Sequence, residues 1–372
     1  MNLRRLGPEY YDRLPIYPPG KPIEETAREF GLAEDQIAKL ASNENVLGPS
    51  PKAVAAIQAA LPKLNLYPDG SAFYLKEALC RRYSNYGVTF DHLLPANGTN
   101  EVIELLMKSI LQPDEKIAVW TPTFIIYELC CRSNGRQVVH VPMDPDFTYG
   151  VDAMIQAIES DPKIKMVFLA NPNNPTGSWV GADWMGEFIQ RLPSEIVFIL
   201  DEAYKEFVRA ENQADGISIA LGRPRTLTMR TFSKAYGLAG IRVGYGIGDR
   251  DMVALLNKAR APFNCNSLAQ AAAVGALEDE EFLVASRELV ENQLPALRRG
   301  LEGFGVKTWD SQTNFLLGDF QQPFDPLFPK FLEEGVILRP MTGYGLPTFA
   351  RVNIGTEANH HRLWAACEKI LG

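Results

Sequence analysis

Short apolar runs with little polar alternation fill the middle of the chain, from residue 93 onward. They lie at 116–120, 137–141, 165–170, 196–200, 226–230 and 241–246. Runs of this kind, separated by stretches of helical periodicity, are typical of a largely parallel sheet that is covered on both faces. The pattern therefore predicts an α/β domain. Only about ten residues separate the last two runs, too few for a crossover helix, so the last strand is predicted to be antiparallel.

The two ends of the chain have a different pattern. The predicted elements there are helices at 23–30, 52–61, 72–83, 267–278, 281–301 and 358–371, and strands at 306–309, 314–318 and 350–355. At 372 residues the chain is long enough for two or three domains. We therefore predict an N-terminal segment (1–45) that packs with a small C-terminal α+β domain (285–372), and a large domain (46–284) between them.

Composition and charge narrow the class of protein. Hydrophobic residues make up 46% and charged residues 22%, which is an ordinary globular profile, and the net charge of −8 disfavours a nucleic-acid surface. No apolar run approaches the ~18 residues of a membrane helix, and Arg4 and Arg5 are not followed by the apolar segment of an export signal. The five cysteines form an odd set without a C-x-x-C pair. We expect a cytoplasmic protein with reduced thiols that binds neither nucleic acid nor a membrane.

Several catalytic motifs are missing from the sequence. There is no Walker A motif, no H-E-x-x-H, no G-x-S-x-G, and no G-x-G-x-x-G, because Asp249 follows Gly244-Tyr245-Gly246 where the third glycine belongs. His360 and His361 are neighbours on the predicted last helix, and a solvated surface is the better interpretation of this pair than a metal site. The absence of these motifs disfavours metal-dependent hydrolysis, serine hydrolysis and a nicotinamide dehydrogenase, and we expect no metal.

Polar groups at the carboxyl ends of the predicted strands are the candidates for chemistry, because ligands of open α/β sheets bind at that edge. Gly98-Thr99-Asn100 opens a helix predicted at 102–111, which suits an anion or is simply a capped helix start. Asn174 lies in a loop with two prolines, which is either a hydrogen-bond donor site or a structural turn. Asp201 ends an apolar strand three residues before Tyr204, and the alternative for it is a helix N-cap.

Two cations complete this set. Lys234 lies in a loop of small residues, with Thr231 and Ser233 before it and Arg242 eight residues after it. A buried ammonium group loses its proton more easily, and the neutral amine is a nucleophile. Arg351 lies inside an apolar strand, where it either pairs with another residue or binds an anionic ligand. One amine, one carboxylate, several donors and an anion site are what pyridoxal phosphate requires.

At these residues the sequence resembles the fold-type I aminotransferases, in the class that includes histidinol-phosphate aminotransferase. The matching motifs extend over nearly the whole chain: Gly20-Lys21-Pro22-Ile23-Glu24-Glu25, Ala41-Ser42-Asn43-Glu44-Asn45, Gly48-Pro49-Ser50-Pro51, Tyr67-Pro68-Asp69-Gly70, Asn173-Asn174-Pro175-Thr176-Gly177, Asp201-Glu202-Ala203-Tyr204, Thr231-Phe232-Ser233-Lys234 and Arg351. The resemblance implies the fold-type I architecture, which has a large domain with a mostly parallel seven-stranded sheet between helices and a smaller α+β domain.

The resemblance also implies roles around the ring of pyridoxal 5'-phosphate. Lys234 bonds covalently to the cofactor and later moves a proton, and Asp201 keeps the ring nitrogen protonated. Asn174 and Tyr204 donate to the phenolic oxygen, and Phe124 stacks on the ring.

The remaining implied residues bind anions. The residues implied for the phosphate are Gly98, Thr99, Asn100, Thr231, Ser233, Arg242 and Tyr67, the last of them from the other subunit. Arg351 is expected to bind the α-carboxylate of the substrate, and Arg339, Tyr17 and Asn43 are placed near the substrate, the first two at its distal anionic group.

By this resemblance the protein is a transaminase that moves an amino group between L-histidinol phosphate and 2-oxoglutarate, giving imidazole acetol phosphate and L-glutamate in histidine biosynthesis. It is expected to be a homodimer with shared active sites. An aromatic amino-acid aminotransferase and an enzyme similar to threonine-phosphate decarboxylase remain as alternatives within the same scaffold. A catalytically inactive binding protein is disfavoured because the lysine and the aspartate are both present.

Overall fold

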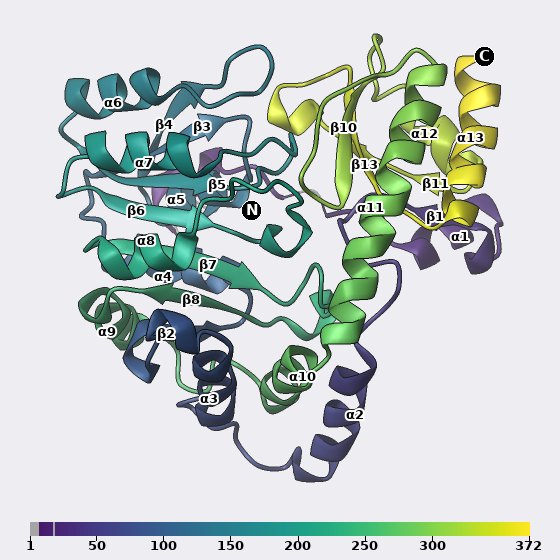
Figure 1. Cartoon of the computed structure of the whole chain (residues 1–372). Coiled ribbons are helices and arrows are strands. Elements are labelled where there is room, and N and C mark those ends of the chain that lie inside the picture. Colours follow the sequence, from purple (N-terminus) through teal and green to yellow (C-terminus); the bar gives the residue numbers. More distant parts are fainter. Residues whose placement is uncertain (1–6, 18) are drawn as a thin grey trace.

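A seven-stranded sheet forms the centre of the computed structural model, which describes residues 7–17 and 19–372 (Figure 1). The spatial order is β2-β8-β7-β6-β5-β3-β4. The bounds of the strands are β2 (Leu93–Ala96), β3 (Lys116–Thr121), β4 (Gln137–Pro142), β5 (Ile164–Ala170), β6 (Val197–Asp201), β7 (Thr226–Thr231) and β8 (Gly244–Gly248). Strands β3 to β7 are parallel, and β8 is antiparallel to both β7 and β2, which confirms the predicted direction of the last strand. Arg4 and Arg5, for which no export signal is predicted, lie outside the described residues.

Helices cover both faces of this sheet (Figure 1). One face packs against α4 (Thr99–Ser109), α5 (Ile126–Ser133) and α9 (Arg250–Ala259), and the other against α6 (Val151–Ser160), α7 (Ala182–Arg191) and α8 (Gly216–Gly222). Neighbouring residues of one strand enter different cores: Ile199 packs toward α4 and Leu200 toward α7. Because both faces are buried, the strands are apolar throughout rather than alternating.

Three of the differences between the predicted and the observed boundaries lie in the large sheet and at its carboxyl edge. The run at 241–246 becomes β8 only from Gly244, because a 3-10 turn (Ala239–Ile241) and Arg242 with φ 61° come first. Helix α4 begins at Thr99 and not at 102, directly after Gly98 with φ 76°. Strand β2 was not predicted at all. It contains Pro95, which an edge strand tolerates because part of its backbone has no partner.

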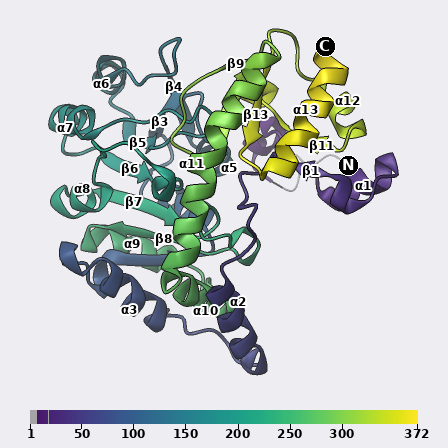
Figure 2. The same ribbon diagram turned by 45° about the vertical axis from the view of Figure 1, so that its right-hand side comes forward.

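A second, smaller sheet lies beside the carboxyl edge of the first (Figures 1 and 2). It has the order β12-β13-β10-β9 and is antiparallel. Its strands are β9 (Lys307–Thr308), β10 (Phe315–Asp319), β12 (Arg339–Pro340) and β13 (Phe349–Asn353), and the helices next to it are α12 (Phe328–Glu333) and α13 (Glu357–Leu371). From the N-terminal segment, α1 (Ile23–Phe30) packs here, and β1 (Ala38–Lys39) pairs in parallel with β11 (Val336–Ile337).

The long helix α11 (Glu280–Gly303) connects the two regions and runs without a break through residue 285 (Figure 2). At its start it adjoins α10 (Ser267–Leu277), which packs against α2 (Pro51–Ala60) and α3 (Phe73–Arg82). The domain limits at 45 and 285 stay predictions, because one helix belongs to both sides of the second limit.

The interpretation of the histidine pair as a solvated surface is wrong for His360. Its exposed fraction is 2%, and its Nε2 accepts a hydrogen bond from the Gly355 amide at 3.0 Å. His361 is exposed, since successive helical residues point in different directions. Within residues 7–17 and 19–372, no group of three or more His, Cys, Asp or Glu side chains could hold a metal ion. No helix of that part of the chain is long and apolar enough to cross a membrane.

Candidate active site

A cavity of about 240 Å³ lies where the parallel strands end and the second sheet begins. The last residues of three neighbouring strands, Ala170, Asp201 and Thr231, all line it. The predicted site residues that line the cavity are Tyr17, Asn43, Thr99, Asn100, Phe124, Asn174, Asp201, Tyr204, Thr231, Ser233, Lys234, Arg242, Arg339 and Arg351. Residues separated by more than 300 positions in the sequence thus meet at one point.

Lys234 lies in the loop that follows β7, and its side chain is buried in this cavity. Its Nζ donates to the carbonyl oxygen of Ser42 at 3.3 Å and lies 5.8 Å from the centre of the Tyr204 ring. Burial lowers the pKa of the Lys234 amine to about 8, and the charges of Arg351 and Arg242 act in the same direction. A substantial fraction of this amine is therefore neutral at mildly alkaline pH and able to act as a nucleophile.

Asp201 is the last residue of β6 and is 4% exposed. The hydroxyl of Tyr127, on α5, donates to Oδ2 at 2.6 Å, and the Ala203 amide donates to Oδ1 at 3.0 Å. Burial raises the pKa of Asp201 to about 6 although these donors act against the shift. A cationic ligand in the cavity would lower this pKa again, because it stabilises the charged carboxylate.

An anion cradle lies at the start of α4. Gly98 is the N-cap residue with φ 76°, and a Cβ built there would lie 2.6 Å from Nη2 of Arg242. The Arg242 guanidinium contacts Ser233 Oγ at 3.5 Å, and the Ser233 amide donates to Thr231 Oγ1 at 3.1 Å. Gly98 itself is not among the lining residues, yet only a glycine lets the guanidinium approach the helix start so closely. A helix N-terminus, two hydroxyls and a guanidinium together suit a phosphate group.

Several buried polar atoms in the cavity lack a protein partner. Arg351 donates to Asn174 Oδ1 and, through Nη2, to the Ala41 carbonyl at 2.7 Å, whereas its Nε has no partner among the described residues. Asn43 donates to the Tyr204 hydroxyl at 2.8 Å, and its own Oδ1 is equally unpaired within that part of the chain. Burial raises the pKa of Tyr204 to about 12, so its phenol stays protonated. Unsatisfied buried polar atoms of this kind indicate room for a polar ligand.

The outer part of the cavity is formed by both chain ends. The Arg339 guanidinium lies 5.7 Å from the centre of the Tyr17 ring. Both residues also line an adjoining cavity of about 630 Å³, together with Tyr344. Phe124 lines the inner cavity, with its ring in an edge contact to Tyr127 (5.5 Å between centroids).

Tyr67 is the predicted site residue that the fold leaves outside. It is 83% exposed and stacks on Phe263, with 4.8 Å between ring centroids, away from the cavity of its own chain. The predicted contribution of Tyr67 therefore requires a second subunit.

Nine lining residues were not among the predicted site residues, and the three of them with a hydroxyl side chain are Ser42, Tyr127 and Tyr344. Tyr127 follows Phe124 by three residues, so helical spacing next to a predicted stacking residue was a usable signal. Ser42 acts through its backbone carbonyl, which carries no signal in the sequence. Tyr344 lies in a 3-10 turn (Thr342–Tyr344) between two short strands, where no periodic pattern exists.

Comparison with known proteins places these features in a family. The family model "Aminotransferase class I and II" matches residues 35–370. A histidinol-phosphate aminotransferase of Anaeromyxobacter sp. is 42% identical over 99% of both chains. Histidinol-phosphate aminotransferase 2 of Pseudomonas fluorescens is 41% identical, over 100% of this chain and 98% of its own.

Solved structures agree with this placement. Histidinol-phosphate aminotransferase from Sinorhizobium meliloti, solved in complex with pyridoxal-5'-phosphate, superposes with a TM-score of 0.88 at 25% identity and covers 98% of this chain and 97% of its own. The aspartate aminotransferase of Thermus thermophilus shares the fold, with a TM-score of 0.84 at 20% identity over 98% of this chain and 99% of its own.

Proposed function

Because the chain belongs to the class I and II aminotransferase family, we propose that it is a pyridoxal-phosphate-dependent transaminase of L-histidinol phosphate and 2-oxoglutarate. Its products are then imidazole acetol phosphate and L-glutamate, as histidine biosynthesis requires. One observation carries the proposal. Lys234, Asp201 and Arg351 line a single cavity in a chain that is 42% identical, over nearly its full length, to a named histidinol-phosphate aminotransferase.

The donor set of the cavity fits pyridoxal phosphate. When bound, this cofactor supplies an aldehyde that condenses with amines and a ring that accepts electrons. The phosphate fits the cradle of Gly98, Arg242 and Ser233, where a Cβ at position 98 would collide with the guanidinium. Thr99, Asn100 and Thr231 line the same end of the cavity.

Lys234 and Asp201 divide the proton chemistry between them. Lys234, as the neutral amine, would bond to the aldehyde carbon of the cofactor with loss of water. Once the amine of the substrate has displaced it, the freed Nζ would take the proton from the substrate Cα. Asp201 stays ionised when it faces the protonated ring nitrogen, and the Tyr127 hydroxyl holds its carboxylate in place. At an effective dielectric constant of about 20, an ion pair at 4 Å contributes roughly 4 kcal/mol, enough to keep that nitrogen protonated.

Other side chains orient the reactants. Tyr204 keeps its proton and can donate it to the phenolic oxygen of the cofactor, and Asn174 retains its amide nitrogen for the same acceptor, since its Oδ1 is occupied by Arg351. Phe124 provides an aromatic face for the ring. We assign Arg351 to the α-carboxylate of glutamate and 2-oxoglutarate, because a guanidinium binds a carboxylate through two parallel hydrogen bonds. Arg339, Tyr17 and Asn43 are assigned to the rest of the substrate.

We further propose a cytoplasmic homodimer. Around the exposed Tyr67, the side chains of Leu64, Leu66, Phe73, Tyr74 and Phe263 are between 45% and 72% exposed in the single chain. A second copy would cover such an apolar surface and bring Tyr67 to the phosphate of the partner's site. All five cysteines are free thiols, which suits a reducing compartment.

A substrate panel read by the absorbance of the bound cofactor tests the function. Histidinol phosphate should convert the aldehyde form of the cofactor to its amine form, and 2-oxoglutarate should restore the aldehyde form. Exchange of aromatic amino acids alone would indicate an aromatic aminotransferase. Carbon dioxide release without an oxo acid would indicate a decarboxylase. Protein that neither takes up colour from pyridoxal phosphate nor is stabilised by it would contradict the proposal altogether.

A further inference from the structure

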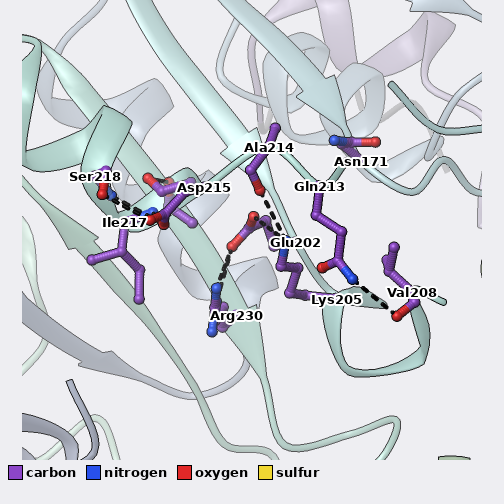
Figure 3. A network of polar contacts seen from close by, with 12 residues as sticks. Asn171, Glu202, Lys205, Val208, Gln213, Ala214, Asp215, Ile217, Ser218 and Arg230 are labelled. Carbon is purple, nitrogen blue, oxygen red and sulfur yellow. Dashed lines mark hydrogen bonds and ion pairs between the residues drawn. The ribbon is translucent and has the colours of Figure 1, made fainter. Parts of the chain in front are cut away.

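An almost fully buried ion pair joins Glu202 and Arg230 (Figure 3). The Glu202 side chain is 1% exposed and the Arg230 side chain 11%. Nη2 and Nε of Arg230 both donate to Oε2 of Glu202, at 2.7 and 2.9 Å. Oε1 of Glu202 has no hydrogen-bond partner in the described part of the chain, and Nζ of Lys205 lies 4.0 Å from it. None of the roles proposed above uses this pair.

The surroundings fix both side chains. Nη1 of Arg230 donates to the Tyr83 hydroxyl at 3.0 Å, which in turn lies 2.6 Å from the Tyr245 hydroxyl. A Cβ built on Gly216 would lie 2.6 Å from the carboxyl carbon of Glu202, so the carboxylate packs directly against the first residue of α8. The network thus connects the end of β6 with α3, α8 and β8.

The pair joins the two segments that carry the reactive groups. Glu202 directly follows Asp201, and Arg230 precedes Lys234 by four residues. Asp201 on β6 is in register with Met229 on β7. Glu202 and Arg230, each one residue further along, are therefore the next pair of neighbours at the ends of these two strands. Successive residues of a strand point to opposite faces, and therefore the pair lies on the side of the sheet opposite to the Asp201 side chain.

Stability alone does not account for a pair of this kind. Removing two charges from water costs several kcal/mol per ion, and apolar residues of similar volume are often neutral or stabilising in such places. Its position at the ends of β6 and β7 gives a geometric reason for charges here. Two hydrogen bonds from a planar guanidinium define the distance and the angle between two strand ends, which apolar contacts do not.

We propose that Glu202 and Arg230 are positioning residues, which hold the Asp201 carboxylate and the Lys234 amine at the separation that the bound cofactor requires. This inference rests on the proposed function. It concerns the chain's own geometry, so its consequences are visible in cofactor binding as well as in turnover.

The decisive variant is the double replacement Glu202→Met with Arg230→Met, because it leaves no unpaired charge behind. We expect the apoprotein to unfold at a urea concentration close to that of the unaltered chain. We expect the dissociation constant of pyridoxal phosphate to rise about tenfold, and the pH midpoint of the bound cofactor's absorbance to move by about half a unit or more, because a small misplacement of reacting groups has large effects. The single variant Glu202→Gln should lose urea resistance as well, since it leaves Arg230 without a counter-charge.

Asp161→Asn provides the matched control. It breaks the Lys116–Asp161 pair, which also joins side chains at 2.7 Å but lies at the amino end of β3, away from the cavity. This variant should change neither the binding of pyridoxal phosphate nor the midpoint of its absorbance. A double variant with unaltered cofactor affinity and unaltered midpoint would show that the pair is only structural, and would overturn the inference. If that variant fails to fold, Arg230→Lys decides, because lysine keeps the charge but cannot reproduce the guanidinium geometry; an unchanged midpoint there overturns the inference equally. If the unaltered chain bound no pyridoxal phosphate, the proposed function itself would fail.

Discussion

Arg230 on β7 and Arg351 on β13 are both arginines buried in strands, but their surroundings shift the pKa values of the two guanidinium groups in opposite directions. Burial acts to lower the pKa of Arg230, but the Tyr83 hydroxyl and the Glu202 carboxylate outweigh it and raise that pKa well above the ordinary value. Burial lowers the pKa of Arg351, which no carboxylate approaches within ion-pair distance in residues 7–17 and 19–372. Its hydrogen bonds go to a side-chain amide and a backbone carbonyl. Arg230 is therefore paired with a carboxylate of the chain itself, whereas Arg351 keeps an unpaired Nε within the described residues, which fits the proposed binding of a substrate anion.

Lys234 extends the comparison to a third cation. Like Arg351, it has no carboxylate at hydrogen-bond distance in the described part of the chain, and its acceptor is the Ser42 carbonyl. Replacement by alanine should lower kcat by about 10⁴-fold, since both the nucleophile and the proton carrier are lost. The apoprotein should not become less stable, because an incompletely compensated buried charge disappears. Steady-state kinetics and thermal unfolding of the apoprotein measure the two effects. Lys369→Ala, at a surface pair with Glu334, is the control and should leave both unchanged.

Arg351→Gln tests the comparison most directly. The variant should lower kcat/KM for glutamate and 2-oxoglutarate by about 100-fold, which corresponds to the loss of a charge-assisted pair of about 3 kcal/mol. Thermal unfolding of the apoprotein should not shift to lower temperature. Arg351→Lys should recover only a small part of the activity, because an ammonium group does not bind a carboxylate bidentately.

The matching variant on the other arginine is Arg230→Gln, which leaves Glu202 buried without a counter-charge and should lower the free energy of unfolding by about 3 kcal/mol. If Arg351→Gln destabilised the apoprotein to the same extent, Arg351 would be a structural cation like Arg230, and the distinction between them would be lost.

Gly216→Ala tests the ion pair of Arg230 by disturbing its partner, Glu202. The new Cβ would lie 2.6 Å from the carboxylate carbon and from Oε1, so the carboxylate or α8 must shift from its present position. Overpacking of this kind should lower the free energy of unfolding by about 2 kcal/mol in urea titrations. Gly222→Ala in the same helix is the control. Its Cβ meets nothing within 4 Å, so we expect no loss of stability.

The sequence predicted the charged residues that line the cavity better than it predicted what surrounds them. Asp201 and Arg351 stood out because a charge inside or next to an apolar strand contradicts the local pattern, and Lys234 stood out because it lies in a loop of small residues. The central strands could be placed to within a few residues for the same reason: burial on both faces makes them apolar throughout. Two-residue strands such as Ala38–Lys39 were missed because they are too short to show a period.

The partners of the reactive groups could not be found in this way. Glu202 looks like one of two acids in a turn until the register of β6 and β7 brings Arg230 beside it. Tyr127 is buried against Asp201 by the packing of α5, across 74 positions of sequence. Such contacts depend on tertiary packing, which single-residue chemistry and periodicity do not report.

His360 shows a third way to bury a basic group, which is to keep it neutral. Burial lowers the pKa of His360 to about 4, and its Nε2 accepts the Gly355 amide just after β13. The folded-state pKa is below the ordinary value of 6.5, so the unfolded chain binds the proton first. The free energy of unfolding therefore has its full value above about pH 6.5 and decreases as the pH falls toward 4. Between pH 7 and pH 5.5 this decrease is about 1 kcal/mol.

His360→Gln should therefore make the free energy of unfolding less dependent on pH in that window by about 1 kcal/mol, as urea titrations at the two pH values would measure. The variant cannot take up the proton, although its side-chain oxygen can still accept the amide. His361→Gln, on the exposed neighbour, should keep the pH dependence of the unaltered chain. An equal pH dependence for His360→Gln and the unaltered chain would mean that His360 has the same pKa in the folded and the unfolded chain, so that burial does not keep it neutral.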